Sequence, residues 1–252
     1  EMRIGGVDQV ALARGEVILA AGAIGSPHLL ELSGIGRPET LQALGIDVRH
    51  ALPGLGENLQ DHLQLRLIYK LKDALTLNTL SASLWGKARI GLEYLLKRSG
   101  PMSMAPSQLG AFAKSDPSLE TPDLEYHVQP LSLDRFGEPL HPFPALTASV
   151  CNLRPESRGS VHAVTPHFTD APAIRPNYLS TAGDRRVAAA AIRLTRRIMA
   201  QPPMLKHDPA EYKPGIAFQN DAELAQAAGQ IGTTIFHPVG TAKMGGDEKA
   251  VV

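Results

Sequence analysis

The sequence lacks several features that would assign it to particular classes of protein. It has one cysteine, Cys151, among 252 residues, which excludes an internal disulfide and a metal site built from several cysteines. Neither charge predominates, since Lys plus Arg and Asp plus Glu both number 25. Electrostatic binding of nucleic acid is therefore not expected. The longest apolar run, from Val17 to Gly25, is far shorter than the roughly 20 residues that span a bilayer. These absences favour a cytoplasmic enzyme without a transmembrane segment, with peripheral membrane association as an alternative.

A complete dinucleotide fingerprint, GxGxxG, is also missing. The nearest approach is Gly54-Leu55-Gly56, which lacks the third glycine and a preceding strand. The chain therefore contains no complete nucleotide-binding βαβ unit of its own.

Residues 1–65 nevertheless have an α/β pattern. The continuous apolar run Val17–Ala21 ends at a glycine and is typical of a fully buried parallel strand. Ser26 is suited to cap a following helix, and Pro27 suits its first position. A second short helix is expected over Pro38–Leu44, and residues 46–48 are expected to be extended.

Residues 66–231 predict a different layer, of α+β type with a mostly antiparallel sheet flanked by helices. The connections are rich in Pro and Gly, which favours antiparallel pairing over βαβ repetition. The expected strands are Leu67–Lys72, Leu124–Leu131, Leu146–Leu153, Gly159–Val164 and Ile174–Leu179. The expected helices are Leu80–Lys97, Asp184–Ala200 and Asn220–Gln230. Residues 232–252 are expected to return to the first layer.

The segment Phe236–Thr241 carries the strongest chemical signal. His237 is followed by Pro238, and Gly240 and Thr241 come next, so rigid neighbours fix the direction of the imidazole. Histidine can accept a proton near neutral pH, as a general base must. His237 is therefore the candidate catalytic residue.

The turn from Gly22 to Pro27 is a second candidate site. Glycines at the start of a helix let the backbone approach a ligand closely, and free amides there favour an anion such as phosphate. Many α/β domains use glycine in such turns only for packing. This motif alone therefore leaves two interpretations open, a phosphate-binding turn and a purely structural turn.

Three segments together resemble the glucose–methanol–choline (GMC) oxidoreductases, flavoproteins that oxidise alcohols. Gly22–Gly36 satisfies the family's second signature at every defined position. Gly56–His62 resembles its next landmark, and His237–Thr241 with Met244-Gly245 is similar to the segment that carries the active-site histidine. The resemblance covers nearly the whole chain. In residues 66–231 it rests on the expected type of fold and not on a sequence motif.

The resemblance implies part of an FAD-binding domain in residues 1–65 and 232–252 and a substrate-binding domain in residues 66–231. The implied function is oxidation of a small-molecule alcohol, with hydride transfer to flavin N5 and His237 as proton acceptor. Either oxygen or a quinone-like carrier would reoxidise the flavin. The residues expected at the cofactor are Ala21, Gly22 and Ser26 at its adenosine or phosphate end, Asp61 in a structural role, and Phe236 beside the isoalloxazine ring.

Two other readings remain beside this one. The resemblance implies a GxGxxG before Gly22–Gly36 and a second catalytic His or Asn after Met244-Gly245, and the sequence contains neither. We therefore interpret it as a fragment whose partner would be the missing N-terminal part of the same enzyme. Such a fragment could be a non-catalytic binding or interaction domain that keeps the family's fold without bound flavin. A hydrolase that uses His237 with Asp61 or a serine is the third reading, although no GxSxG or HExxH motif supports it.

No metal site is expected. Histidines elsewhere in the chain have no partners at metal-ligand spacing and are interpreted as surface or satisfied core residues. These are His28, His50, His127, His141, His162, His167 and His207.

Overall fold

The computed structural model describes residues 2–135 and 137–252, and the chain divides into two compact units. The first unit contains the chain up to Asn58 together with Ser160–Ile174 and Val239–Val252. The second contains Leu59–Gly159 and Arg175–Pro238. The expected ranges differ from this division, because the first unit also takes residues 160–174 and the chain returns to it at Val239 rather than at residue 232.

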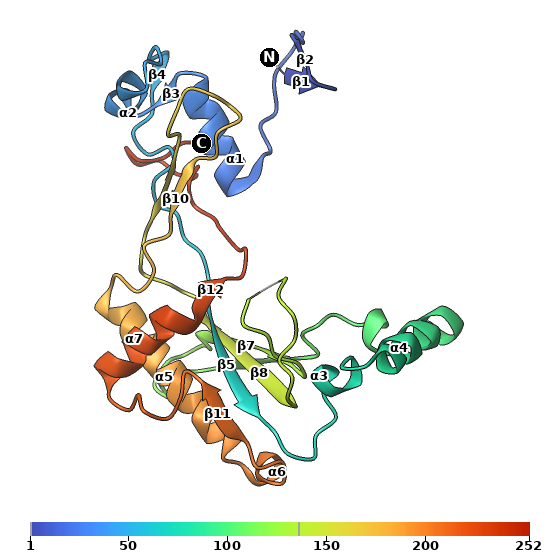
Figure 1. Ribbon diagram of the computed structural model, residues 1–252. Helices are drawn as coiled ribbons and strands as arrows, with labels where there is room; N and C mark the ends of the chain where they lie inside the picture. Colours follow the sequence, from blue (N-terminus) through green and yellow to red (C-terminus); the bar gives the residue numbers. More distant parts are fainter. Residues whose placement is uncertain (1, 136) are drawn as a thin grey trace. The chain divides into compact units, whose positions relative to one another are not determined.

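The second unit is built on an antiparallel sheet (Figure 1). Its strands, in spatial order, are β11 (Ala210–Lys213), β5 (Leu63–Lys70), β8 (Ala145–Asn152), β7 (Leu124–Gln129) and β6 (Leu109–Ala113), and β12 (Gly232–Thr234) also pairs with β5. Every pairing among these strands is antiparallel, which confirms the predicted type of sheet.

Two helices pack on one face of this sheet and form the core of the second unit. They are α5 (Ala182–Met199) and α7 (Asp221–Ile231). Side chains alternate along a strand, so Leu65, Leu67 and Tyr69 of β5 all point to the helix side, where they are buried. Small residues on α5 let it lie close to the sheet, and Ile192 is fully buried there.

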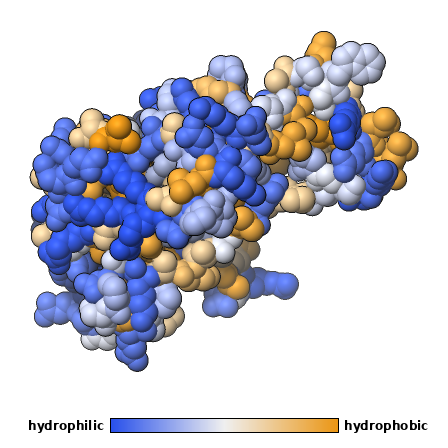
Figure 2. All heavy atoms as spheres, turned by 90° about the horizontal axis from the view of Figure 1, so that it is seen from below, coloured by the Kyte–Doolittle hydropathy of each residue, from blue (hydrophilic) through white to orange (hydrophobic). Residues whose placement is uncertain are grey.

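The remaining helices of the second unit are peripheral. They are α3 (Leu77–Leu80), α4 (Leu84–Lys97), α6 (Pro202–Leu205) and the 3-10 helix η1 (Pro101–Ser103). The apolar side of α4 is exposed, with Trp85 at 87% exposure. Hydrophilic side chains cover much of the face in Figure 2, and hydrophobic ones form separate patches among them.

The first unit consists of short elements. These are β1 (Met2–Ile4), β2 (Val7–Gln9), α1 (Gly22–Leu32), β3 (Ile35–Gly36), α2 (Pro38–Ala43), β4 (His50–Ala51), β9 (Ser160–His162) and β10 (Ala173–Arg175), whose last residue belongs to the second unit. Strands β3 and β4 pair in parallel, β1 with β2 antiparallel, and β9 with β10. The predicted helix at Pro38 is confirmed.

Three local predictions for the first unit were wrong. Val17–Ala21 forms no strand, and Val17 is 82% exposed, because no described segment supplies the neighbouring strands that a buried strand needs. Residues 46–48 form no strand either. Helix α1 begins at Gly22 rather than after Ser26, so Pro27 lies inside the helix and not at its first position.

None of the described helices is long and apolar enough to cross a membrane.

Candidate active site

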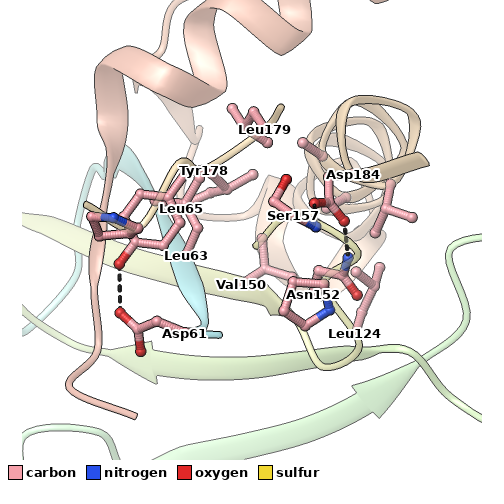
Figure 3. A pocket seen from close by; sticks show the side chains of 15 residues that line it. Asp61, Leu63, Leu65, Leu124, Val150, Asn152, Ser157, Tyr178, Leu179 and Asp184 are labelled. Carbon is pink, nitrogen blue, oxygen red and sulfur yellow. Dashed lines mark hydrogen bonds between the residues drawn. The ribbon is translucent and has the colours of Figure 1, made fainter. Parts of the chain in front are cut away.

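The loop after β12 carries His237, and a buried carboxylate holds it in place. Asp61 accepts a hydrogen bond from the backbone N–H of His237 at 3.0 Å and another from the hydroxyl of Thr234 at 2.5 Å. A third comes from the hydroxyl of Tyr178 at 2.5 Å, drawn as a dashed line in Figure 3. Burial, and then this bond to Asp61, raise the pKa of Tyr178 well above its usual value, so the hydroxyl stays a donor. Asp61 thus fixes the backbone of the loop.

Phe236 occupies the position before the histidine in an unusual conformation. Its φ is 65°, in the left-handed region that residues other than glycine seldom adopt. Its backbone N–H donates to the Thr234 hydroxyl at 2.9 Å, and the residue is 71% exposed. The hydrogen bonds of Thr234 and Asp61 therefore hold a strained turn that leaves the aromatic ring on the surface.

The His237 imidazole is exposed and touches a second histidine. Its Nδ1 lies 3.2 Å from Nδ1 of His62, and the two rings meet edge to face with their centroids 5.3 Å apart. The other ring nitrogen of His62, Nε2, lies 3.1 Å from the carbonyl oxygen of Leu153. The structure therefore joins two histidines that are 175 residues apart in the sequence.

Asp61 does not bind the imidazole of His237 but only its backbone. A serine or cysteine hydrolase needs the carboxylate to orient the ring of the histidine and a nucleophile beside the ring. Within the described residues, His62 is the group whose side chain is hydrogen-bonded to the ring. This arrangement argues against the hydrolase reading.

His62 lies at the edge of the sheet face that is turned away from α5 and α7. Cys151 of β8 pairs with both Gln64 and Glu125, so these side chains form one row across the sheet. Ligand atoms of His62, Glu125 and Cys151 lie within 4.8 Å of one another. Burial, with a contribution from Glu125, raises the pKa of the Cys151 thiol to about 12, and both nitrogens of His62 are engaged. The three groups are therefore poorly suited to bind a metal ion, which needs a thiolate and a free imidazole nitrogen.

Two hollows of the second unit differ greatly in size. The first, shown in Figure 3, lies between the sheet and α5 and has a volume of about 30 Å³, with Asp61, Tyr178 and Asp184 in its wall. Such a space holds a water molecule or two but no alcohol of metabolite size. The second has a volume of about 750 Å³, and Arg66 and Phe236 line it. Of these two hollows, the second is the one large enough for a substrate.

In the first unit, the start of α1 holds Ala21, Gly22 and Ser26. The hydroxyl of Ser26 accepts the backbone N–H of Ala21 at 3.1 Å, and Gly22 has a φ of 73° with open space where a Cβ would stand. The helix has no side-chain cap hydrogen bond and no acidic residue in its first turn. An exposed helix start of this kind suits a phosphate group such as those of FAD.

Helix α1 is also bound to the segment that follows the histidine. Pro27 has no N–H to donate to the carbonyl of Ala23, its partner in a regular helix. The hydroxyl of Thr241, which is fully buried, donates to that carbonyl instead at 2.5 Å. The side chain of Asn58 donates to the carbonyl of Gly240 at 3.2 Å. Residues of all three recognised sequence landmarks thus meet in the first unit.

His162 has a partner that the sequence did not reveal. Its Nδ1 lies 2.7 Å from the fully buried carboxylate of Glu31, and its Nε2 lies 3.3 Å from Glu57. The hydrogen bond to Glu31 raises the pKa of His162, with a smaller contribution from Glu57. The predicted role as a surface or satisfied core residue agrees with this arrangement, which ties α1 to β9.

The structure thus groups the expected site residues in two sets. Asp61, Phe236 and His237 lie together in the second unit, while Ala21, Gly22 and Ser26 lie together in the first. The orienting contacts of Thr234 and Tyr178 were not predicted from the sequence, and His62 was recognised only as the last residue of the landmark Gly56–His62. The adjacency of His62 to Asp61 was the one available signal.

Comparison with known proteins decides the family. Two family models described as GMC oxidoreductase match residues 2–64 and 155–252. The chain belongs to the GMC oxidoreductases. It is 39% identical over 242 residues to an oxygen-dependent choline dehydrogenase of Citrobacter koseri, covering 96% of this chain and 43% of that protein. It is 37% identical to an alcohol dehydrogenase [acceptor] of Pseudomonas putida, covering 94% of this chain and 43% of that protein. The chain thus spans less than half the length of these relatives.

Solved structures of two oxidases have a similar fold over the part that they share with this chain. A pyridoxine 4-oxidase from Mesorbium loti matches with a TM-score of 0.75 and 27% identity, over 92% of this chain and 42% of that one. A formate oxidase matches with a TM-score of 0.82 over 91% of this chain and 45% of that one; at 24% identity it supports the fold alone. The family and the fold class predicted from the sequence are confirmed.

Proposed function

We propose that this GMC oxidoreductase chain is part of an FAD-dependent enzyme that oxidises an alcohol to an aldehyde or ketone, with His237 as the proton acceptor. The observation that supports this most is the exposed imidazole of His237, whose backbone is fixed by Asp61 and whose ring contacts His62. The names of the relatives, choline dehydrogenase and alcohol dehydrogenase, indicate the same chemistry.

The residues present suit FAD in each unit considered by itself. In the first unit, the amides at the start of α1, with Ala21, Gly22 and Ser26, would hold a phosphate. In the second, the exposed ring of Phe236 would lie beside the isoalloxazine ring, while Asp61 would act by holding the loop. When bound, FAD takes up the hydride that leaves the alcohol carbon.

The protein's own contribution is the movement of the hydroxyl proton. The O–H bond of the alcohol breaks and its proton passes to the free ring nitrogen of His237, while the C–H bonding pair leaves as hydride. Because Asp61 and His62 fix the imidazole beforehand, little reorganisation is needed at that moment.

The substrate would enter the hollow of about 750 Å³ that Phe236 lines. That volume suits a small-molecule alcohol. Oxygen or a quinone-like carrier would take the electrons afterwards; the name of the choline dehydrogenase relatives specifies oxygen for those proteins.

The test is reduction of the flavin by an alcohol, measured without oxygen in the FAD-loaded protein that contains this chain. We expect His237→Ala to slow this step by about 100-fold or more, the usual contribution of a general base. His50→Ala, an exposed histidine of the first unit, is the matched control and should leave the rate unchanged. An unchanged rate in His237→Ala would refute the proposed role.

The rival proposal is that the chain is a non-catalytic binding domain that keeps the family's fold. The visible absorption spectrum of the purified chain separates the two, because bound oxidised flavin is yellow. A chain that binds no added FAD under any condition would support the rival for this polypeptide.

A further inference from the structure

The contacts of His62 determine which nitrogen of His237 carries a proton. A backbone carbonyl can only accept a hydrogen bond, so the nitrogen of His62 that faces Leu153, Nε2, must carry the hydrogen. In neutral imidazole the second nitrogen then has a lone pair and accepts. Nδ1 of His62 is therefore an acceptor.

The hydrogen-bonding state of His62 in turn determines that of His237. Because Nδ1 of His62 accepts, the hydrogen between the two Nδ1 atoms, 3.2 Å apart, belongs to His237. The neutral ring of His237 then has its lone pair on Nε2. None of the described residues hydrogen-bonds to that nitrogen, and the ring is exposed.

We propose that His62 is a positioning residue that keeps His237 in its Nδ1–H form, so that Nε2 is always ready to take a proton from a substrate. The inference deepens the proposed function and rests on it. An unrestrained histidine side chain favours the opposite form, with hydrogen on Nε2, which cannot accept a proton there. Without His62, most His237 rings would present a donor instead of a base.

The arrangement also stabilises His237 after it takes the proton. Both nitrogens of the charged ring are then donors, and Nδ1–H still points at the lone pair of His62. The carbonyl of Leu153 polarises His62 in turn through its bond to Nε2–H. A neutral histidine bound to a carbonyl thus takes the place that a carboxylate holds in hydrolase triads.

The test is nitrogen NMR of the chain with labelled histidine, which distinguishes a protonated from an unprotonated ring nitrogen and needs neither cofactor nor turnover. At mildly alkaline pH, we expect His237 to show a protonated Nδ1 and an unprotonated Nε2. In His62→Leu, we expect the hydrogen to move mostly to Nε2. In His62→Gln, the carboxamide can accept from His237 and donate to Leu153, so the wild-type form should persist.

Two further measurements complete the test. His127→Gln, a change at another histidine of the same sheet, is the control and should leave the His237 signals unchanged. In the FAD-loaded protein, His62→Leu should slow flavin reduction about tenfold or more, and His62→Gln should recover most of that loss.

The outcomes separate this inference from the proposed function. A wild-type His237 with its hydrogen on Nε2, or one whose hydrogen stays on Nδ1 in a folded His62→Leu protein, would overturn the positioning role. The protonated nitrogen of His237 could instead depend on His62 while His237→Ala still reduces flavin at the wild-type rate. That combination would uphold the positioning role and overturn the proposed function.

Discussion

A single carboxylate, Asp61, fixes the position of His237. The left-handed backbone at Phe236 costs on the order of 1–3 kcal/mol, so something must hold it. Asp61 does so through three hydrogen bonds, from the His237 backbone, Thr234 and Tyr178. Hydrogen bonds to a charged group contribute roughly 1.5–3 kcal/mol each, enough to offset the strain.

Asp61→Asn should therefore lower the free energy of unfolding by about 2 kcal/mol, because the NH2 group that replaces one carboxylate oxygen cannot accept the hydrogen bonds donated to that oxygen. Urea unfolding of the purified chain measures the change. Asp73→Asn, at an exposed position in the same unit, should change it by less than about 0.5 kcal/mol. Equal effects in the two variants would show that Asp61 is not the residue that holds the loop.

The sequence predicted some of these residues and not their contacts. The Pro and Gly beside His237 are local signals, so an imidazole of fixed direction could be predicted. The contact with His62 joins positions 175 residues apart and depends on how β12 pairs with β5. No local pattern carries that information.

At the scale of elements, α1 depends on the segment that follows His237. Pro27 leaves the carbonyl of Ala23 without its helical partner, and the buried hydroxyl of Thr241 supplies the missing donor. A buried carbonyl without a donor would cost about 1–3 kcal/mol. The proline of one sequence landmark and the threonine of another are thus physically linked.

A double-mutant cycle tests this link. Thr241→Val alone should lower the free energy of unfolding by about 1–2 kcal/mol. In a Pro27→Ala background the loss should be smaller by about 1 kcal/mol, because the alanine restores a backbone N–H that can reach the carbonyl of Ala23. Thermal or urea unfolding of the four proteins gives the coupling, and purely additive losses would contradict the proposed link.

Element prediction succeeded where the signal was local. Helices α5 and α7 and strands β5, β7 and β8 lie within a few residues of their expected ranges, because their apolar spacing matches a surface that the same chain buries. The apolar spacing of Val17–Ala21 matches a buried strand equally well, yet the described chain offers it no neighbours. The spacing of apolar residues predicts which face a segment can bury. It does not predict whether another segment is present to cover that face.

At the scale of the whole molecule, each of the two units carries one set of the residues that the proposed function uses. One unit presents an exposed helix start suited to phosphate, and the other presents an imidazole together with a hollow of about 750 Å³. The family models match both units, and the relatives are more than twice as long as this chain. The proposed function therefore depends on whether His237 takes a proton when flavin and alcohol are both bound.

Chemical rescue tests proton transfer to His237 most directly. His237→Ala in the FAD-loaded protein should reduce its flavin slowly with an alcohol, and added imidazole should raise the rate in proportion to its neutral concentration, because the exposed site admits a free base. A variant that imidazole leaves unchanged, or one that already reacts as fast as the wild type, would contradict proton transfer to His237.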